Sequence, residues 1–351
     1  MISLLHCRFS CLNVLRSYHS CSQAPESCPC QFVDDAVSQF NRMLDVHPIP
    51  SILEFGKILG SLVKMKHYPT SISLSQLMEF RGIEPNLVTL SILINCFCHL
   101  GQISFAFSVL GKILKLGYEP NTITLTTLIK GLCLKGEIKK ALDIHDKLVT
   151  QGFHLNQVSY GTLINGLCKF GETRAAIHLL RRIEEQLIQP NVVMYNTIID
   201  GLCKDKLLAE ACNLYSEMIV KGISPDTVTY NSLIYGFCLV GKLKEATGFL
   251  NEMILKRINL NAYTYNILVD AFCKEGQLQE AKTVLAVMMR VGVKPNVVTY
   301  NSLMEGYFLV KEVNKANCVF NIMGQTGISN QTDISMIIWD ALSHIAVSFY
   351  T

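Results

Sequence analysis

Apolar residues recur at helical spacing in the stretch from Thr227 to Asn261. The first half carries apolar residues at i, i+3, i+4, i+7 and i+8, the pattern of one buried helix face: Tyr230, Leu233, Ile234, Phe237 and Cys238. Gly241 follows, and a glycine can adopt the positive φ that ends a helix. A second stripe then begins, made of Leu243, Ala246, Phe249, Leu250 and Met253. The stretch therefore predicts two short helices joined by a tight turn.

The same pattern returns every 35 residues, and a fixed period overrides any prediction made segment by segment. Eight frames follow without a gap: 52–86, 87–121, 122–156, 157–191, 192–226, 227–261, 262–296 and 297–331. Two short helices leave apolar surface uncovered, whereas stacked copies cover it on both sides. The sequence predicts an all-α fold, a right-handed α-solenoid superhelix of tandem helix-turn-helix repeats.

Small and turn-forming residues also recur with this period. Alanine occupies the same place in seven frames, where we expect it to let two helices approach: Ala106, Ala141, Ala176, Ala211, Ala246, Ala281 and Ala316. Glycine is predicted to close the first helix at Gly101, Gly136, Gly171, Gly241 and Gly276. Glycine followed by proline, as in Gly222 and Pro225, is predicted to form the corner between frames.

Three segments lie outside the frames. Residues 1–31 are basic, contain several serines and are poor in acidic residues, which predicts a disordered organellar transit peptide. The alternative is an unstructured terminus that carries no targeting signal. Residues 32–51 resemble a degenerate half repeat, and residues 332–351 form a divergent C-terminal tail.

Composition limits the partners. Half of the residues are apolar, only 17% are charged, and the apolar residues are periodic, so no bilayer span and no membrane partner are expected. The formal net charge of +3 permits an anionic partner but does not demonstrate one. Six of the 14 cysteines recur every 35 residues on the buried stripe, which favours a core role over a disulfide ladder: Cys98, Cys133, Cys168, Cys203, Cys238 and Cys273.

No set of residues in the sequence predicts catalysis. The histidines are scattered, and no cysteine or histidine group has the spacing of a zinc site. No aspartate cluster suits a two-metal nuclease, and no deaminase-like motif is present. We therefore expect no enzyme activity, no metal, no cofactor and no small-molecule substrate.

A 35-residue helical hairpin with the motif V-T-Y-N resembles the pentatricopeptide repeat. Val298, Thr299, Tyr300 and Asn301 match the motif residue for residue, as does the segment 228–231. The unbroken 35-residue frames resemble the P-type class, and the repeated G-L-C-K and Y-N-x-L-I strings resemble plant fertility restorers.

The resemblance implies binding of single-stranded organellar RNA, one repeat per nucleotide. It implies that the fifth and thirty-fifth residues of a frame hydrogen-bond the base edge. Because Asn231 follows Tyr230, its amide is expected to turn off the core toward one surface. The candidate base-contacting residues are Ser91, Asn121, Thr126, Asn156, Asn191, Asn196, Asp226, Asn231, Asn261, Asn266, Asn296 and Asn301.

Pairs of these residues resemble known base preferences. Ser91 with Asn121 and Thr126 with Asn156 resemble adenine pairs, and Asn196 with Asp226 resembles a uracil pair. Asn231 with Asn261 and Asn266 with Asn296 resemble pyrimidine pairs. Gly56 with Asn86, Gly161 with Asn191, and Asn301 with Gln331 match no familiar pair.

The resemblance also implies that the second residue of a frame wedges between bases, and these residues are Val88, Ile123, Val158, Val193, Val228, Tyr263 and Val298. The alternative is an ordinary solvated face. Lys169, Lys204 and Lys274 end first helices and are candidates either for phosphate contacts or for stabilising the helix dipole.

Three interpretations remain open at this point. The first is a sequence-specific RNA-binding protein, mitochondrial or alternatively plastid, that acts in transcript processing, stability or translation, with a recruited nuclease or other processing factor as a further partner. The second is a protein-binding helical scaffold. The third is a truncated, non-functional copy of a longer restorer-like protein.

Overall fold

The computed structural model describes residues 29–153, 155–185 and 188–325. These ranges contain 17 helices and no strands, so the prediction of an all-α solenoid is confirmed. Residues 1–28 of the expected transit peptide, the whole expected tail and Gln331 lie outside the described residues. The helices fall into two compact units, Met1–Gly166 and Leu167–Thr351, whose boundary lies within α9.

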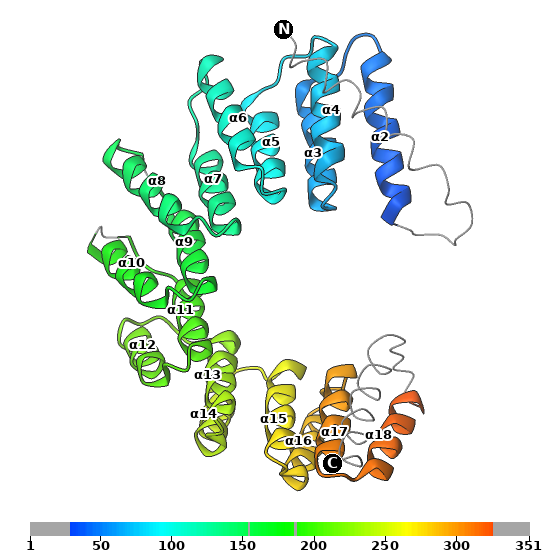
Figure 1. Cartoon of the computed structure of the whole chain (residues 1–351), viewed down its shortest axis with the longest axis vertical. Helices are drawn as coiled ribbons and strands as arrows, with labels where there is room; N and C mark the ends of the chain where they lie inside the picture. Colours follow the sequence, from blue (N-terminus) through cyan, green and yellow to red (C-terminus); the bar gives the residue numbers. More distant parts are fainter. Residues whose placement is uncertain (1–28, 154, 186–187, 326–351) are drawn as a thin grey trace, which may run out of the picture. The chain divides into compact units, whose positions relative to one another are not determined.

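The first unit consists of helices in pairs (Figure 1). First helices α3, α5 and α7 contact one another in order, while α4 packs against both α3 and α5, and α6 against both α5 and α7. Helices α4 and α6 thus each cover their own first helix and the next one, which explains why both stripes are apolar. The bounds are α2 Pro29–Asp45, α3 Ile52–Lys64, α4 Tyr68–Phe80, α5 Leu87–His99, α6 Ile103–Lys115, α7 Thr122–Leu134, α8 Ile138–Thr150 and α9 Gln157–Lys169.

The second unit repeats this arrangement. First helices α11, α13, α15 and α17 contact one another in order, and α12 and α16 each contact the first helices on both sides. The bounds are α10 Thr173–Glu185, α11 Val192–Lys204, α12 Leu208–Val220, α13 Thr227–Leu239, α14 Leu243–Leu255, α15 Ala262–Lys274, α16 Leu278–Arg290, α17 Val297–Leu309 and α18 Val313–Gln325.

The turn inside each pair contains a residue with positive φ, as the recurring glycines led us to expect. Gly241 has a φ of +73°, and the other four predicted turn glycines also have a positive φ. Lys206 occupies the equivalent place in its frame with φ of +61°, a conformation that costs an L-residue roughly 1–2 kcal/mol. The turn geometry is therefore retained even where the sequence lacks the glycine.

A contact between glycine and cysteine sets how closely successive first helices stack. A Cβ added to Gly236, in the tenth place of its frame, would lie 2.6 Å from Cβ and 2.7 Å from Sγ of Cys203. The other tenth-place glycines with such a cysteine contact are Gly131, Gly166, Gly201 and Gly306. The frame at 262 has Ala271 instead, and the cysteine of the preceding frame, Cys238, is only partly buried. The tenth place is thus glycine because the cysteine side chain fills the space of its Cβ.

The recurring cysteines are packing residues in the described structure. The nine cysteines from Cys96 to Cys318 are free, and burial raises the pKa of Cys98 and of Cys203 to about 12. A thiol with so high a pKa stays protonated and is a poor nucleophile. The predicted core role holds, although Cys168 and Cys238 are only partly buried.

Ion pairs tie the second helices together in the second unit. Arg181 on α10 pairs with Glu217 on α12, and Lys221 lies 2.7 Å from the same carboxylate. The hydroxyl of the buried Tyr195 donates to Glu217 at 3.1 Å. Hydrogen bonds from Arg181 hold the pKa of Glu217 at about 2, well below its usual value. This carboxylate is accordingly a charged partner of several groups at once.

Within the described ranges, none of the helices has the length and apolar character that crossing a membrane requires.

Candidate functional site

The residue before each first helix from α5 to α17 caps that helix, whereas Ser51 before α3 makes no side-chain capping bond. Asp226 accepts hydrogen bonds from the backbone N–H groups of Val228 at 2.9 Å and Thr229 at 3.0 Å. Six asparagines in the same place accept from a backbone N–H in the first turn of the next helix: Asn86, Asn121, Asn156, Asn191, Asn261 and Asn296. A side-chain oxygen at this place satisfies a helix donor that has no partner inside the helix. These thirty-fifth residues therefore have a structural role, which the preference of Asn and Asp for the N-cap could have revealed from the sequence.

Three of the four fifth-place asparagines are buried, which corrects the expectation that Asn231 turns to the surface. Asn196, Asn231 and Asn266 are each 6% exposed. Since an amide buried without a partner is costly, each of these side chains needs a group that satisfies it. Their partners lie in the next frame, about 33 residues further along the chain.

A threonine in the third place of the next frame holds each of these amides. Thr229 donates its hydroxyl to Asn196 Oδ1 at 2.6 Å, and Thr264 donates to Asn231 Oδ1 at 2.8 Å. A third such bond, also 2.6 Å long, joins Thr299 to Asn266. On their other side, Asn196 Nδ2 donates to Asp226 at 2.9 Å, and Asn266 Nδ2 donates to Asn296 at 3.1 Å. The fifth, thirty-fifth and third places thus form one small polar network at the junction of two frames.

Hydroxyl groups replace the amides in two frames of the first unit. Ser91 Oγ lies 2.8 Å from Thr124 Oγ1, and Thr126 Oγ1 lies 2.6 Å from Ser159 Oγ. Ser91 also donates to the carbonyl of Leu87 at 2.7 Å, so its single proton is used within its own helix. Toward a ligand, Ser91 therefore offers an acceptor oxygen rather than a donor.

Exposed apolar side chains lie beside this network, on the first turn of the first helix in each frame. The second-place residues are all more than half exposed, which is unusual for so regular a series of large apolar groups: Val88 56%, Ile123 70%, Val158 67%, Val193 62%, Val228 54%, Tyr263 59% and Val298 55%. Such positions are available for contact with a planar apolar surface.

The frames with a fifth-place glycine have open space in place of an amide. Leu53, Gly56, Asn86 and Val88 line a cavity of 390 Å³ in the first unit, together with residues of the first turn of α3. A Cβ at Gly161 would meet no atom within 4 Å. The structure thus assigns no hydrogen-bonding side chain to the fifth place of these two frames.

All three candidate lysines are exposed, and two of them, Lys204 and Lys274, pair with an aspartate one turn earlier, while Lys169 is the third. Lys204 lies 2.6 Å from Asp200, and Lys274 lies 2.8 Å from Asp270. The hydrogen bond to the neighbouring aspartate raises the pKa of each lysine, so both stay charged. Their side chains are 60% and 58% exposed, so they remain accessible to an anion, but part of their charge is already balanced.

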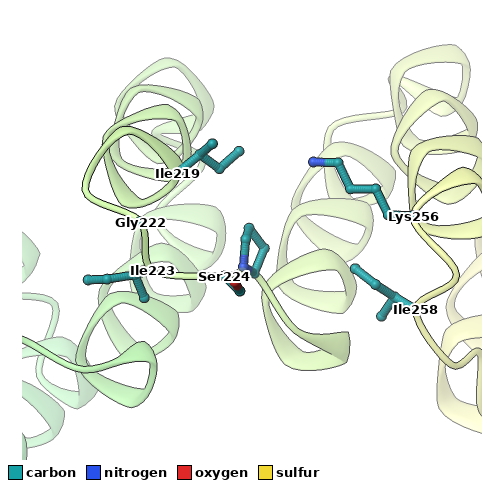
Figure 2. Close-up of a pocket in the computed structure, with 7 residues that line it drawn as sticks. Ile219, Gly222, Ile223, Ser224, Lys256 and Ile258 are labelled. Atoms are coloured by element: carbon teal, nitrogen blue, oxygen red, sulfur yellow. The ribbon is translucent and has the colours of Figure 1, made fainter.

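A second cavity lies at the corner after α12. Figure 2 shows Ile219 and Ile223 on one side and Lys256 and Ile258 on the other, around a space of 420 Å³. Its lining is mostly apolar, and Lys256 is paired with Glu252 at 2.7 Å. No group of His, Cys, Asp or Glu in the described ranges could hold a metal ion. The cavity therefore brings together no reactive groups.

Comparison with known proteins identifies the repeat. The model described as "PPR repeat family" matches residues 92–134, 120–169, 190–239, 225–274 and 264–308, and the model described as "PPR repeat" matches residues 158–186 and 298–328. Together these matches cover more than half of the chain.

Individual relatives match shorter parts. Pentatricopeptide repeat-containing protein At1g12300, mitochondrial, of Arabidopsis thaliana is 43% identical over 84 residues, which is 24% of this chain and 13% of that protein. Pentatricopeptide repeat-containing protein At4g26800 of the same plant is 47% identical over 87 residues, 24% of this chain and 17% of that protein. The matched segments thus span less than a fifth of these relatives.

Among solved structures, the maize pentatricopeptide repeat protein PPR10 has a TM-score of 0.51 at 21% identity, covering 90% of this chain and 54% of that chain. This likeness shows the fold. A complex of the same maize protein with an 18-nt psaJ RNA element is also similar, with a TM-score of 0.48 at 21% identity over 88% of this chain and 55% of that one.

Proposed function

The chain belongs to the pentatricopeptide repeat family, and we propose that it binds single-stranded RNA, one nucleotide per repeat. The observation that carries the proposal is the series of exposed second-place residues next to a polar network of fixed geometry. A base that lies between two second-place side chains buries apolar surface against them. Its edge then faces the fifth and thirty-fifth residues. The maize protein PPR10 binds an 18-nt psaJ RNA element, and we propose a ligand of the same class for this chain.

The network leaves polar atoms that suit a base edge. Asn196 uses one N–H and one lone pair of its amide inside the protein, so one donor and one acceptor remain. Uracil offers a donor at N3 beside two acceptor oxygens, which fits this remaining pair. We propose uracil for the frame at 192, pyrimidines for the frames at 227 and 262, and adenines for the frames at 87 and 122.

We further propose that the protein is of the P-type class, resides in mitochondria and acts on a transcript without catalysis, by protecting it, blocking a site or recruiting a nuclease. Unbroken 35-residue frames support the class, and the names of several relatives support the compartment. The paired lysines Lys204 and Lys274 would lie beside phosphates.

Selection from a pool of random single-stranded RNA tests the proposal. We expect the full chain to enrich A-A-x-U-Y-Y tracts, with a slope of log K against log salt near −0.7 per phosphate contacted. Retention without sequence preference would reject the base assignments. No retention by the folded protein at micromolar concentration would reject RNA binding and favour a protein partner.

A matched pair of variants tests the second-place residues directly. Val228→Ala removes an exposed side chain from the proposed interface, whereas Val220→Ala removes one that is 86% exposed on α12. We expect only Val228→Ala to weaken RNA binding, by about 3-fold or more, from the apolar contact that it deletes. Equal affinities of the two variants would argue against wedging.

A further inference from the structure

The hydroxyl of each third-place threonine of the second unit has two side-chain acceptors in range, of which the amide of the previous frame is the nearer. Thr229, Thr264 and Thr299 are fully buried. The backbone N–H of Asp226 donates to Thr229 Oγ1 at 3.0 Å, so the hydroxyl oxygen already accepts one bond. A hydroxyl has a single proton, and Thr229 Oγ1 lies 2.6 Å from Asn196 Oδ1 but 3.2 Å from Asp226 Oδ1. The threonine therefore donates to the nearer acceptor, the amide oxygen of the previous frame.

The three amides differ in how many groups hold them. Asn196 and Asn266 each donate from Nδ2 to the capping residue of their own frame, in addition to accepting from a threonine. For Asn231, the bond from Thr264 is the one side-chain hydrogen bond found among the described residues. Rotation of the Asn231 amide by half a turn would exchange its donor and its acceptor. Thr264 opposes this rotation, because its hydroxyl lies 2.8 Å from Asn231 Oδ1 and 3.1 Å from Asn261 Oδ1.

We propose that Thr264 is a positioning residue that sets the base selectivity of the preceding repeat by fixing the orientation of the Asn231 amide. The inference rests on the proposed function and deepens it: the pyrimidine bound by the frame at 227 is selected by a side chain of the frame at 262. Thr229 and Thr299 act in the same way on Asn196 and Asn266, with the capping residue as a second constraint.

The last frame has no threonine to hold its fifth-place amide. Asn301 Oδ1 is buried and has no hydrogen-bond partner among the described residues. In the sequence, the third place of the following frame is Ile334, which lies outside the described residues and has no hydroxyl to donate. The frame at 297 should accordingly select its base less strictly than the frames at 192, 227 and 262.

Two series of synthetic RNAs test the inference with the full chain. The series 5′-AAAAUNUA-3′ varies the base opposite the frame at 227, and the series 5′-AAAANUUA-3′ varies the base opposite the frame at 192. Thr264→Val removes the hydroxyl at nearly constant shape. Loss of one hydrogen bond predicts that selectivity in the first series falls about 3- to 10-fold while selectivity in the second series is unchanged.

Controls separate positioning from a loss of stability. Thr264→Ser should restore the selectivity, because it restores the donor. Thr247→Val makes the same change at a partly exposed threonine of α14 whose hydroxyl bonds to the carbonyl of Lys244 in its own helix, and it should alter neither series. Equal loss in both series, or no loss in the first, overturns the inference while RNA binding stands. Failure of the unmodified protein to bind any of these RNAs overturns the proposed function itself.

Discussion

Gly236 offers a direct test of how the first helices stack. In Gly236→Ala, the new Cβ would lie 2.6 Å from Cβ of Cys203 and 3.0 Å from Cδ2 of Leu208, where ordinary contact begins at 3.4 Å. The nearest atom belongs to the base of a side chain and cannot rotate away. Helices α11 and α13 must therefore separate, and overpacking of this kind costs about 1–3 kcal/mol.

Alanine also favours the helix over glycine, by up to about 1 kcal/mol, and this gain must be separated from the steric cost. Gly248 provides the comparison, because it lies within α14 and a Cβ there would meet nothing within 4 Å. Gly248→Ala should stabilise the protein by about 0.5–1 kcal/mol. Since the helical gain is common to both variants, their difference in unfolding free energy should equal the steric cost of about 1–3 kcal/mol.

Urea unfolding followed by far-ultraviolet circular dichroism measures this difference. Stacked repeats couple to their neighbours, so destabilisation at one junction should lower the midpoint for the second unit. Ala271→Gly, at the same place one frame later, should destabilise the protein because the site already accommodates a Cβ. Equal midpoints for Gly236→Ala and Gly248→Ala would refute the argument that cysteine occupies the Cβ space.

Three further predictions concern stability and reactivity. Lys206→Gly should raise the unfolding free energy by about 1 kcal/mol in the same urea assay, because it removes a non-glycine residue at φ of +61°; an unchanged midpoint would contradict the cost assigned to this turn. The pKa of Glu217 is lowered from 4.5 to about 2 in the folded protein, so the stability from its pairing with Arg181 is present above pH 4.5 and is lost as the pH falls toward 2. Glu217→Gln should flatten this part of the curve of stability against pH, and parallel curves for the two proteins would count against the pairing. Alkylation of the folded protein in mildly alkaline buffer should label the exposed Cys318 much faster than Cys203, whose pKa is raised to about 12 by burial, as peptide mass analysis would show; similar rates would mean that the first helices open readily.

The architecture followed from the sequence because every cue recurred with one period. Stripes such as Tyr230, Leu233 and Ile234 predicted buried faces, and Gly241 predicted a turn that the structure places at φ of +73°. Each of these cues acts within one helix or one turn, so local rules were enough.

The contacts between frames could not be predicted in this way. The cysteine that explains Gly236 lies 33 residues earlier, and Thr264, which holds Asn231, lies 33 residues later. A stripe tells which residues are buried, but not which atoms meet across two frames. For Asn231 the place one residue after Tyr230 predicted a surface amide, and this was wrong because a partner from the next frame satisfies the amide in a buried position.

The shared role of the thirty-fifth residue limits how this protein can evolve or be redesigned. Under the proposed function, one side chain both contacts a base and caps the helix of the next repeat, as Asp226 does for α13. Few residue types cap well, and replacing a good cap by a poor one costs about 1 kcal/mol. An exchange of Asn for Asp keeps the cap and changes only the outer atom from donor to acceptor. The repertoire of RNA sequences open to such a chain is therefore bounded by helix capping, and a new target is reached most cheaply through Asn and Asp exchanges.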